Sequence, residues 1–329
     1  MTNPITVIIF SRDRAMQLDA VLHSFFLHCL DASETTQIYI IYKSSSAQHV
    51  TQYLRLETDY PTVHFIRQGN FRHDMLNLLN LAPMQSFLSL RYGLACALGA
   101  LGFRTGTHLD LWMRRWVDTP RLKLIRALIL HNPRPGGILF LVDDNIFVGD
   151  FHLNPVMQTL SQNPKALGFS LRLGYNTIVS YSANEHQPLP VFSPVNNGFL
   201  QFRWVEASHD FGYPLEVSSS LYLNTTITPF LVSVAFRNPN ELEAAIASRA
   251  SIFRESHPIL LCFEHSVTFC NPVNIVQSFH PNRAGEHIHY EVDELVQRFE
   301  RGERVDVHAY SGFVPDGCHQ EIPLRFKQT

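Results

Sequence analysis

In the first part of the chain, hydrophobic and polar positions alternate between a strand-like and a helix-like pattern. Short β-branched and aromatic runs occupy residues 5–10, 38–42 and 63–66. Between them, apolar residues recur at helical spacing over 18–29, and a shorter helix is expected over 50–56. Strands that alternate with helices predict parallel strands joined by right-handed crossovers. The pattern therefore predicts an α/β fold with a doubly wound, mostly parallel sheet flanked by helices.

A further apolar run over 138–142 follows Gly136 and Gly137 and ends in Asp143-Asp144-Asn145. An unbroken apolar run of this length is typical of a strand buried on both faces. Open α/β sheets bind their ligands at the carboxyl ends of such strands. Two adjacent carboxylates repel each other, and a hard divalent cation relieves that repulsion. The motif indicates a metal that carries a phosphate; the alternative is a surface turn with two solvated carboxylates.

Composition and charge exclude several classes of protein. The chain has 329 residues, 45% of them hydrophobic, and a net charge of −3, which argues against a general nucleic-acid binder. Its five cysteines are scattered without a C-x-x-C pair, as expected in a reducing compartment. The first residues lack the pattern of a signal peptide, and no uncharged apolar stretch has transmembrane length. We expect a cytoplasmic protein.

The segment 85–135 differs from its surroundings. It contains eight Arg or Lys residues, two acidic residues, Trp112 and Trp116, and two stretches, 87–98 and 122–130, with the pattern of helices. Such a basic helical insertion could lie against the inner face of an anionic membrane or near a lipid-linked acceptor. A helical subdomain packed on the core or on a second chain is an equally good interpretation.

Three segments taken together resemble a known family. The loop after the first strand (Phe10-Ser11-Arg12-Asp13-Arg14), the stretch Gly69-Asn70-Phe71-Arg72-His73-Asp74 and the Asp143-Asp144-Asn145 motif occur in the order found in nucleotide-sugar glycosyltransferases of the GT-A fold. The spacing is most similar to the bacterial family-2-like and exostosin-like group. The resemblance implies one Rossmann-like GT-A catalytic domain over 1–329. Its parts would be a nucleotide-sugar-binding half (4–84 and 136–205), the insertion (85–135), and a less regular acceptor-side half with a C-terminal lid (206–329).

The resemblance also assigns roles to individual residues. The donor-binding residues would be Ser11, Arg12, Asn70, Arg72, Asp74 and Asp143. Asp144, Asn145 and His319 would hold a divalent metal, Mn²⁺ or Mg²⁺. Asn145 departs from the family's D-x-D pattern, in which the last residue is Asp. For each residue a structural role is the alternative: a solvated arginine, a helix cap at Asp74, or one ordinary member of 17 histidines.

An inverting transfer needs a base that removes the proton of the acceptor hydroxyl. Asp210 and Glu216, on either side of the sequence Phe-Gly-Tyr-Pro, are the available carboxylates, and related sequences place a helix after this stretch. A retaining reaction would need no such base, and Glu216 could instead be an exposed residue at a helix start. Arg283 is expected on a lid, where it could reach a phosphate.

The sequence therefore predicts a metal-dependent hexosyltransferase that moves sugar from a nucleoside-diphosphate sugar, most commonly a UDP-sugar, to a glycan or lipid-linked acceptor of surface polysaccharide or glycolipid synthesis. A degenerate family member that acts as a binding or scaffold protein is the second hypothesis. A nucleotidyltransferase is the third. The absence of the G-x-G-x-x-G and P-loop patterns disfavours dinucleotide-binding and P-loop proteins.

Overall fold

The computed structural model describes residues 5–81, 136–275 and 283–329. The insertion over 85–135, its two expected helices and the expected membrane contact lie outside these ranges. A helix that spans a bilayer needs about 20 predominantly apolar residues. None of the described helices combines that length with sufficient hydrophobicity.

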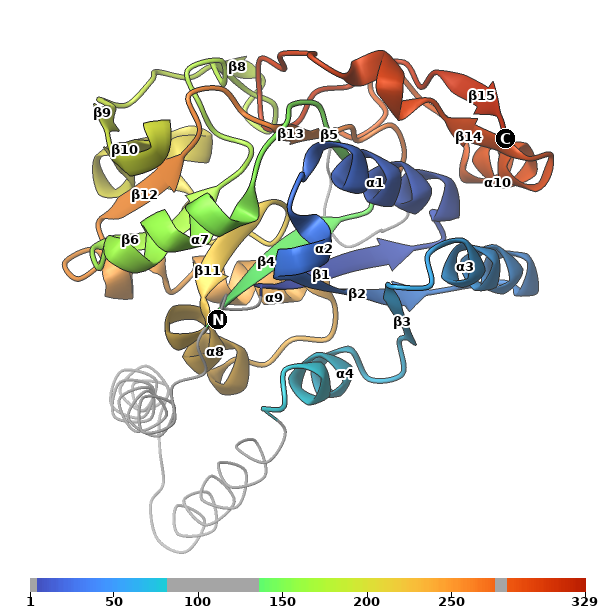
Figure 1. Cartoon of the computed structure of the whole chain (residues 1–329), viewed down its shortest axis with the longest axis horizontal. Helices are drawn as coiled ribbons and strands as arrows, with labels where there is room; N and C mark the ends of the chain where they lie inside the picture. The colour runs from blue at the N-terminus through green and yellow to red at the C-terminus, as the bar shows by residue number, and fades with distance from the viewer. Residues whose placement is uncertain (1–4, 82–135, 276–282) are drawn as a thin grey trace, which may run out of the picture.

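A nine-stranded sheet forms the centre of the molecule, with strand order β3-β2-β1-β4-β11-β6-β12-β10-β9 (Figure 1). Its first four strands are parallel to one another. Their bounds are β1 Ile5–Arg12, β2 Thr36–Lys43, β3 His64–Arg67 and β4 Gly137–Val142. The predicted α/β fold with a large, mostly parallel sheet is confirmed. The expected crossovers place the carboxyl ends of β1 and β4 side by side.

The second half of the chain completes the same sheet. Strand β11 (Ser220–Leu223) lies antiparallel between β4 and β6 (Ala166–Ser170), and β12 (Ile259–Cys262) runs parallel to β6. Strands β10 (Leu200–Arg203) and β9 (Ser193–Pro194) extend the sheet in antiparallel fashion. The carboxyl ends of β6 and β12 therefore lie on the same edge of the sheet as those of β1 and β4.

Alternation along each strand buries side chains on both faces. In β1, Val7 and Ile9 belong to one core and Ile8 and Phe10 to the other. The first core packs under α1 (Ala15–His28), α3 (Ala47–Asp59), α7 (Leu153–Gln162) and α10 (Val292–Glu300). The second packs under α4 (Phe71–Leu78), α8 (Asn224–Ser233) and α9 (Pro239–Ala247) (Figure 1).

Helix ends follow the local sequence. The Asn238 side chain accepts a hydrogen bond from the Glu241 backbone N–H, and Pro239, whose fixed φ suits the first helical position, starts α9. Gly302, with φ of +83°, follows the end of α10, where glycine adopts the left-handed conformation that ends a helix. The helix expected after the Phe-Gly-Tyr-Pro stretch is α8, and one strand separates it from that stretch. Strand β11 comes first, because Leu221 and Tyr222 fill the space between β4 and β6.

Shorter elements cross the carboxyl edge of the main sheet. Strand β5 (Asn145–Phe147) pairs with β13 (Thr268–Cys270), and single bridges join Cys270 to His319 and Val179 to Gly317. This crossing brings the C-terminal segment beside the Asp143-Asp144 motif. The remaining short elements are α2 Ala32–Thr35, β7 Val179–Ser180, β8 Glu185–His186, β14 Glu303–Val305, β15 Phe326–Gln328 and the 3-10 helices η1 Asn196–Gly198, η2 Trp204–Glu206, η3 His209–Gly212, η4 Ala250–Phe253 and η5 Val307–Tyr310.

Candidate functional site

Arg14 is the cation that faces the two carboxylates after β4. Its Nη1 lies 2.9 Å from Asp143 Oδ1 and 3.8 Å from Asp144 Oδ2. Its Nη2 donates to the backbone oxygen of Asn274 at 2.5 Å. The backbone N–H of Arg12 donates to Asp143 Oδ2 at 3.0 Å. Both oxygens of Asp143 are thus engaged by the loop after β1, which fixes the carboxylate pair against that loop.

Two buried polar atoms in this cluster have no hydrogen-bond partner within the described residues: Arg14 Nε and Asp144 Oδ1. Burial and the neighbouring Asp143 raise the pKa of Asp144 above its ordinary value. Burial alone would lower the pKa of Arg14, but Asp143 and Asp144 outweigh it and raise that pKa. An unpaired buried donor and an unpaired buried acceptor each cost about 1–3 kcal/mol, and a bound group that pairs with either atom would offset that cost.

Asn145 has a structural role in the described conformation. Its Oδ1 accepts the Val142 backbone N–H at 2.9 Å, and its Nδ2 donates to Cys270 Sγ at 3.5 Å. The side chain is fully buried. The amide closes the turn that carries Asp143 and Asp144, which explains an Asn at this position. Its assignment as a metal ligand stays a prediction.

The residues predicted from the first loop are divided between two environments. Ser11 is buried and its Oγ lies 2.6 Å from the Tyr53 hydroxyl oxygen. The Arg12 side chain is 47% exposed and lies 3.6 Å from Asp13. Arg12 therefore contacts Asp143 through its backbone N–H, while its side chain lies at the surface. The arginine that reaches the carboxylates is Arg14, which the sequence analysis did not single out.

Asn70, Arg72 and Asp74 organise the start of α4 and its packing. The Asn70 side chain accepts from the His73 backbone N–H, and Asp74 accepts from that of Gly69 at 2.8 Å. Arg72 donates to the backbone oxygens of Val232 and Val234 at the end of α8. Asn70 is the N-cap of α4, so the alternative of Asp74 as the cap is wrong; Asp74 lies in the first turn and binds the backbone N–H of Gly69. The donor-binding role of these residues stays a prediction.

A second polar group, missed in the sequence, lies where β1 and β2 end. Asp13 has a φ of +55° and its Oδ1 accepts the Ser45 backbone N–H at 2.7 Å. His49 Nε2 lies 3.8 Å from the same carboxylate oxygen. Ser44 Oγ and His49 Nδ1 are buried without a partner among the described residues. A non-glycine residue held at positive φ is a recurrent feature of ligand sites. The signal in the sequence was the polar run after residue 42.

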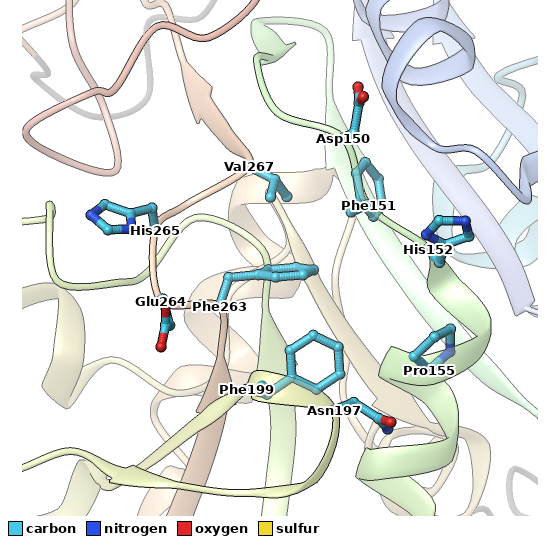
Figure 2. Close-up of a pocket in the computed structure, with 11 residues that line it drawn as sticks. Asp150, Phe151, His152, Pro155, Asn197, Phe199, Phe263, Glu264, His265 and Val267 are labelled. Atoms are coloured by element: carbon cyan, nitrogen blue, oxygen red, sulfur yellow. The ribbon is translucent and has the colours of Figure 1, made fainter.

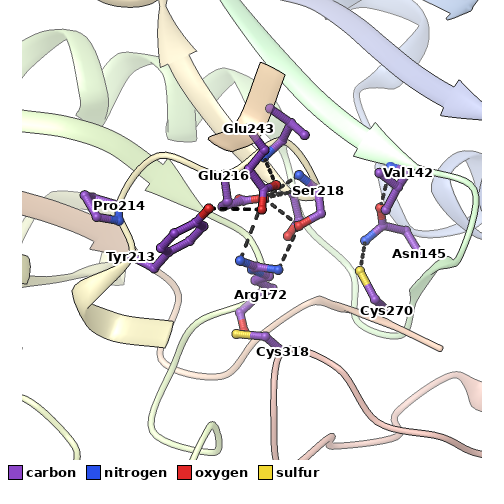
Figure 3. A network of polar contacts seen from close by, with 12 residues as sticks. Val142, Asn145, Arg172, Tyr213, Pro214, Glu216, Ser218, Glu243, Cys270 and Cys318 are labelled. Atoms are coloured by element: carbon purple, nitrogen blue, oxygen red, sulfur yellow. Dashed lines mark hydrogen bonds and ion pairs between the residues drawn. The ribbon is translucent and has the colours of Figure 1, made fainter. Parts of the chain in front are cut away.

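A buried network surrounds Arg172, which follows β6 (Figure 3). Arg172 donates to Ser218 Oγ at 2.7 Å and lies 3.9 Å from Glu216 Oε2. Glu216 is 2% exposed and also accepts from the Ser218 hydroxyl and from the Ser218 and Ser219 backbone N–H groups. The alternative of an exposed helix start is therefore wrong for Glu216. Its carboxylate holds the 216–219 loop against the Arg172 cation.

Asp210, the other predicted catalytic carboxylate, is half-buried on η3. Gln187 Nε2 donates to Asp210 Oδ2 at 3.2 Å, and the Asp210 backbone N–H donates to Gln187 Oε1. Burial raises the pKa of Asp210, while the Arg172 charge opposes this shift. The preceding residue, His209, has a φ of +52°. A carboxylate with a raised pKa next to a strained residue is a suitable general base.

His319 lies next to β13, where it forms a bridge with Cys270. Cys270 in turn pairs with Asn145 of β5. Burial, together with the Arg172 charge, lowers its pKa to about 3. A neutral imidazole is the form that binds a metal. The described residues contain no group of three or more His, Cys, Asp or Glu side chains able to hold a metal ion. Asp144 Oδ1 is the one buried carboxylate oxygen without a hydrogen-bond partner among the described residues. The predicted metal site at Asp144, Asn145 and His319 stays a prediction.

We expect His319 to remain neutral from pH 8 down to pH 5. NMR of the imidazole nitrogens, assigned with a His319→Gln variant, would check this. The unfolded state binds a proton below the ordinary pKa of 6.5, and the folded state binds one only near 3. The contribution of His319 to stability is therefore complete above pH 6.5 and is lost as the pH falls. A His319 titration midpoint above 6 would contradict this.

The C-terminal segment also fixes the loop that carries Arg283. Glu321 accepts the backbone N–H groups of residues 286, 287 and 288 and the Tyr181 hydroxyl at 2.5 Å. Burial alone would raise the pKa of Glu321, but these donors lower it. Arg283 Nε lies 2.8 Å from Glu286, and the guanidinium is over the Tyr181 ring. Arg283 thus packs beside the Tyr181 ring. The centroid of that ring lies 6.0 Å from the centroid of the His319 ring.

No protein-family model matches the chain. A curated relative, the bifunctional glycosyltransferase pgtA of Dictyostelium discoideum, is 21% identical over 262 residues, which cover 73% of this chain and 28% of that protein. The chain thus spans little more than a quarter of the length of this relative.

Among solved structures, the apo structure of the bifunctional glycosyltransferase WbbM aligns with 79% of this chain and 45% of that chain. The identity is 10% and the TM-score is 0.28. A TM-score this low does not define a common fold.

Proposed function

We propose that this chain is a glycosyltransferase of the GT-A type that moves a hexosyl group from a nucleoside-diphosphate sugar to a hydroxyl of a glycan or lipid-linked acceptor. One observation carries the proposal: the unpartnered Arg14 Nε and Asp144 Oδ1 lie buried together at the carboxyl edge of a parallel sheet. The similarity to a bifunctional glycosyltransferase over 73% of the chain supports it. A UDP-sugar is the favoured donor.

The donor diphosphate would lie against Arg14. As the bond between the sugar and the phosphate breaks, negative charge builds on the leaving diphosphate, and a fixed guanidinium stabilises that charge. Asp143 orients Arg14 through the 2.9 Å ion pair. The nucleoside would occupy the neighbouring loops, where Asp13, Ser44 and His49 offer hydrogen-bonding atoms. In this proposal the donor lies against the loops after β1 and β2, and the predicted donor contacts of Asn70, Arg72 and Asp74 stay predictions.

Asp144, with His319 as a second ligand, would hold the divalent cation. When bound, such a cation neutralises the diphosphate and acts as a Lewis acid on its oxygens. Arg14 already supplies one positive charge to the carboxylate pair. The predicted requirement for Mn²⁺ or Mg²⁺ belongs to this proposal.

On the acceptor side, Asp210 is the better general base of the two predicted carboxylates. Its pKa is raised by burial, and Glu216 is committed to four hydrogen bonds within its own loop. In an inverting transfer, the acceptor oxygen forms the bond to the anomeric carbon, its proton passes to Asp210, and the nucleoside diphosphate leaves.

UDP is expected to raise the melting temperature of the chain by several degrees at a concentration 100-fold above its dissociation constant. Binding at that excess stabilises the folded state by about 2.7 kcal/mol. Differential scanning fluorimetry with UDP, GDP, CDP and TDP, each with and without Mn²⁺, measures the shift. An Arg14→Lys variant should show a smaller shift, and the exposed Arg12→Ala variant an unchanged one. The absence of a shift with all four nucleotides would refute the donor site.

Turnover separates this proposal from the two other hypotheses. A nucleotidyltransferase releases pyrophosphate, a glycosyltransferase releases a nucleoside diphosphate, and a scaffold protein that binds the nucleotide releases neither. Incubation with a panel of nucleotide sugars and analysis of the released nucleotide distinguishes the three. Transfer or hydrolysis at a measurable rate would exclude the scaffold hypothesis.

A further inference from the structure

A groove of about 560 Å³ lies where the chain leaves β5 and β12, apart from the cluster around Arg14 (Figure 2). Its floor is apolar, with Phe199 and Val267 buried and Phe263 half-buried. Exposed polar residues surround this floor, with His152 and Glu264 on opposite sides of the Phe263 ring. Asn197 and Asp150 add an amide and a second carboxylate. A concave aromatic surface with a few polar groups at its rim is typical of a ligand site.

The lining residues favour one class of ligand. No Lys or Arg is among the described residues that line the groove, and two are acidic. A phosphate or a nucleic acid would therefore be repelled. A sugar unit has an apolar C–H face that can lie on a phenylalanine ring, and its hydroxyls donate to carboxylates and accept from an amide or an imidazole. The groove has the chemistry for a neutral saccharide.

The segment that lines one side of the groove, 263–267, packs against the segment 171–175. The Tyr175 backbone N–H donates to the backbone oxygen of Glu264 at 2.7 Å. The Val267 backbone N–H donates to the backbone oxygen of Leu171 at 2.9 Å. At Gly174 a Cβ atom would lie 2.7 Å from the Glu264 backbone oxygen, so the two segments are in close contact. Arg172 lies within this paired segment. The groove thus borders the segment that carries the Arg172 network.

The distance to the Asp143-Asp144 motif follows from the sheet. Strand β12 is three positions from β4 in the same sheet, and both strands end on the same edge. Three strand spacings of about 4.8 Å separate them by roughly 15 Å. A chain of several sugar units could therefore have its reacting end beside the Asp143-Asp144 motif and a distal unit in the groove.

We propose that this groove binds a distal saccharide unit of an oligosaccharide acceptor, which makes the substrate an oligosaccharide and not a single sugar. The inference rests on the proposed function, since it names the acceptor of that reaction. It adds a second contact about 15 Å from the reacting centre, by the strand spacing above.

An array of immobilised tri- to hexasaccharides tests the groove directly with the intact chain. The test variant carries His152→Ala and Glu264→Ala, both at exposed rim positions. His152 makes no capping hydrogen bond to α7, so its removal leaves the helix start intact. The matched control is Glu300→Ala, an exposed acidic residue on α10. The stabilisation by UDP is measured in parallel for all three proteins.

The wild type and the control are expected to bind the same oligosaccharides, and the double variant should bind them at least tenfold more weakly with an unchanged response to UDP. Absence of oligosaccharide binding by the wild type, or equal binding by the double variant, would overturn the groove proposal. Loss of the UDP response in the wild type with oligosaccharide binding retained would instead refute the donor site.

Discussion

Replacement of Arg14 by alanine is expected to lower the rate of sugar transfer by roughly 100- to 1,000-fold, the loss typical when one fixed donor to a developing negative charge is removed. Arg14 is the guanidinium that contacts both Asp143 and Asp144, at 2.9 Å and 3.8 Å. In the proposed complex, its unpaired Nε would donate to the diphosphate. Steady-state kinetics of nucleoside diphosphate release measure the effect.

Loss of the Arg14 charge also leaves buried carboxylates without their cation, which costs about 3–5 kcal/mol when a buried pair is broken. The controls must therefore separate folding from chemistry. Arg14→Lys keeps the charge but loses the paired donors, and should fold with transfer still slowed. Arg12→Ala removes a side chain that is 47% exposed and should retain transfer. If folded Arg14→Lys and Arg12→Ala proteins were equally active, Arg14 would have no role in transfer.

Glu216→Ala is expected to destabilise the chain by about 3–5 kcal/mol, because it leaves the buried Arg172 cation without its partner. It also removes the acceptor for the Ser218 and Ser219 backbone N–H groups. Urea denaturation followed by circular dichroism measures the change. Glu216→Gln should lose less stability, since an amide oxygen still accepts hydrogen bonds.

Glu206→Ala is the matched control for Glu216. Glu206 also forms an ion pair, with Arg203, but its side chain is 65% exposed. Surface ion pairs contribute about 0–1 kcal/mol, so this variant should be nearly as stable as the wild type. A Glu216→Ala protein of wild-type stability that has lost turnover would reverse the assignment. Glu216 would then be the catalytic carboxylate predicted from the sequence.

Local patterns were sufficient to predict the parallel half of the sheet. Runs such as 5–10 and 138–142 are apolar on both faces, and that pattern alone indicates a central parallel strand. Strand β11 was missed, because its position between β4 and β6 depends on long-range pairing that four residues cannot specify. The same limit applies to β5 and β13, three residues each.

The carboxylate motif was located correctly at the end of β4, but its arginine was not. Arg12 and Arg14 both occur in the same loop, and no periodicity distinguishes them. The positive φ of Asp13 turns the chain between them, and Arg14 then faces Asp143 while the Arg12 side chain points to solvent. For Arg72, the contact with the end of α8 joins residues 160 positions apart, which a sequence pattern cannot reveal.

The contact between Arg14 and Asn274 has a consequence for the order in which the protein forms. It joins residues 260 positions apart, and the Cys270–His319 bridge adds a segment made later still. During synthesis the N-terminal elements emerge first, so β1 and β2 can pair long before Asn274 and His319 have been made. Contacts of such sequence separation form late, after their loop-closure entropy has been overcome. The set of contacts that holds Arg14 between Asp143 and Asn274 is therefore complete only after residue 274 has been made.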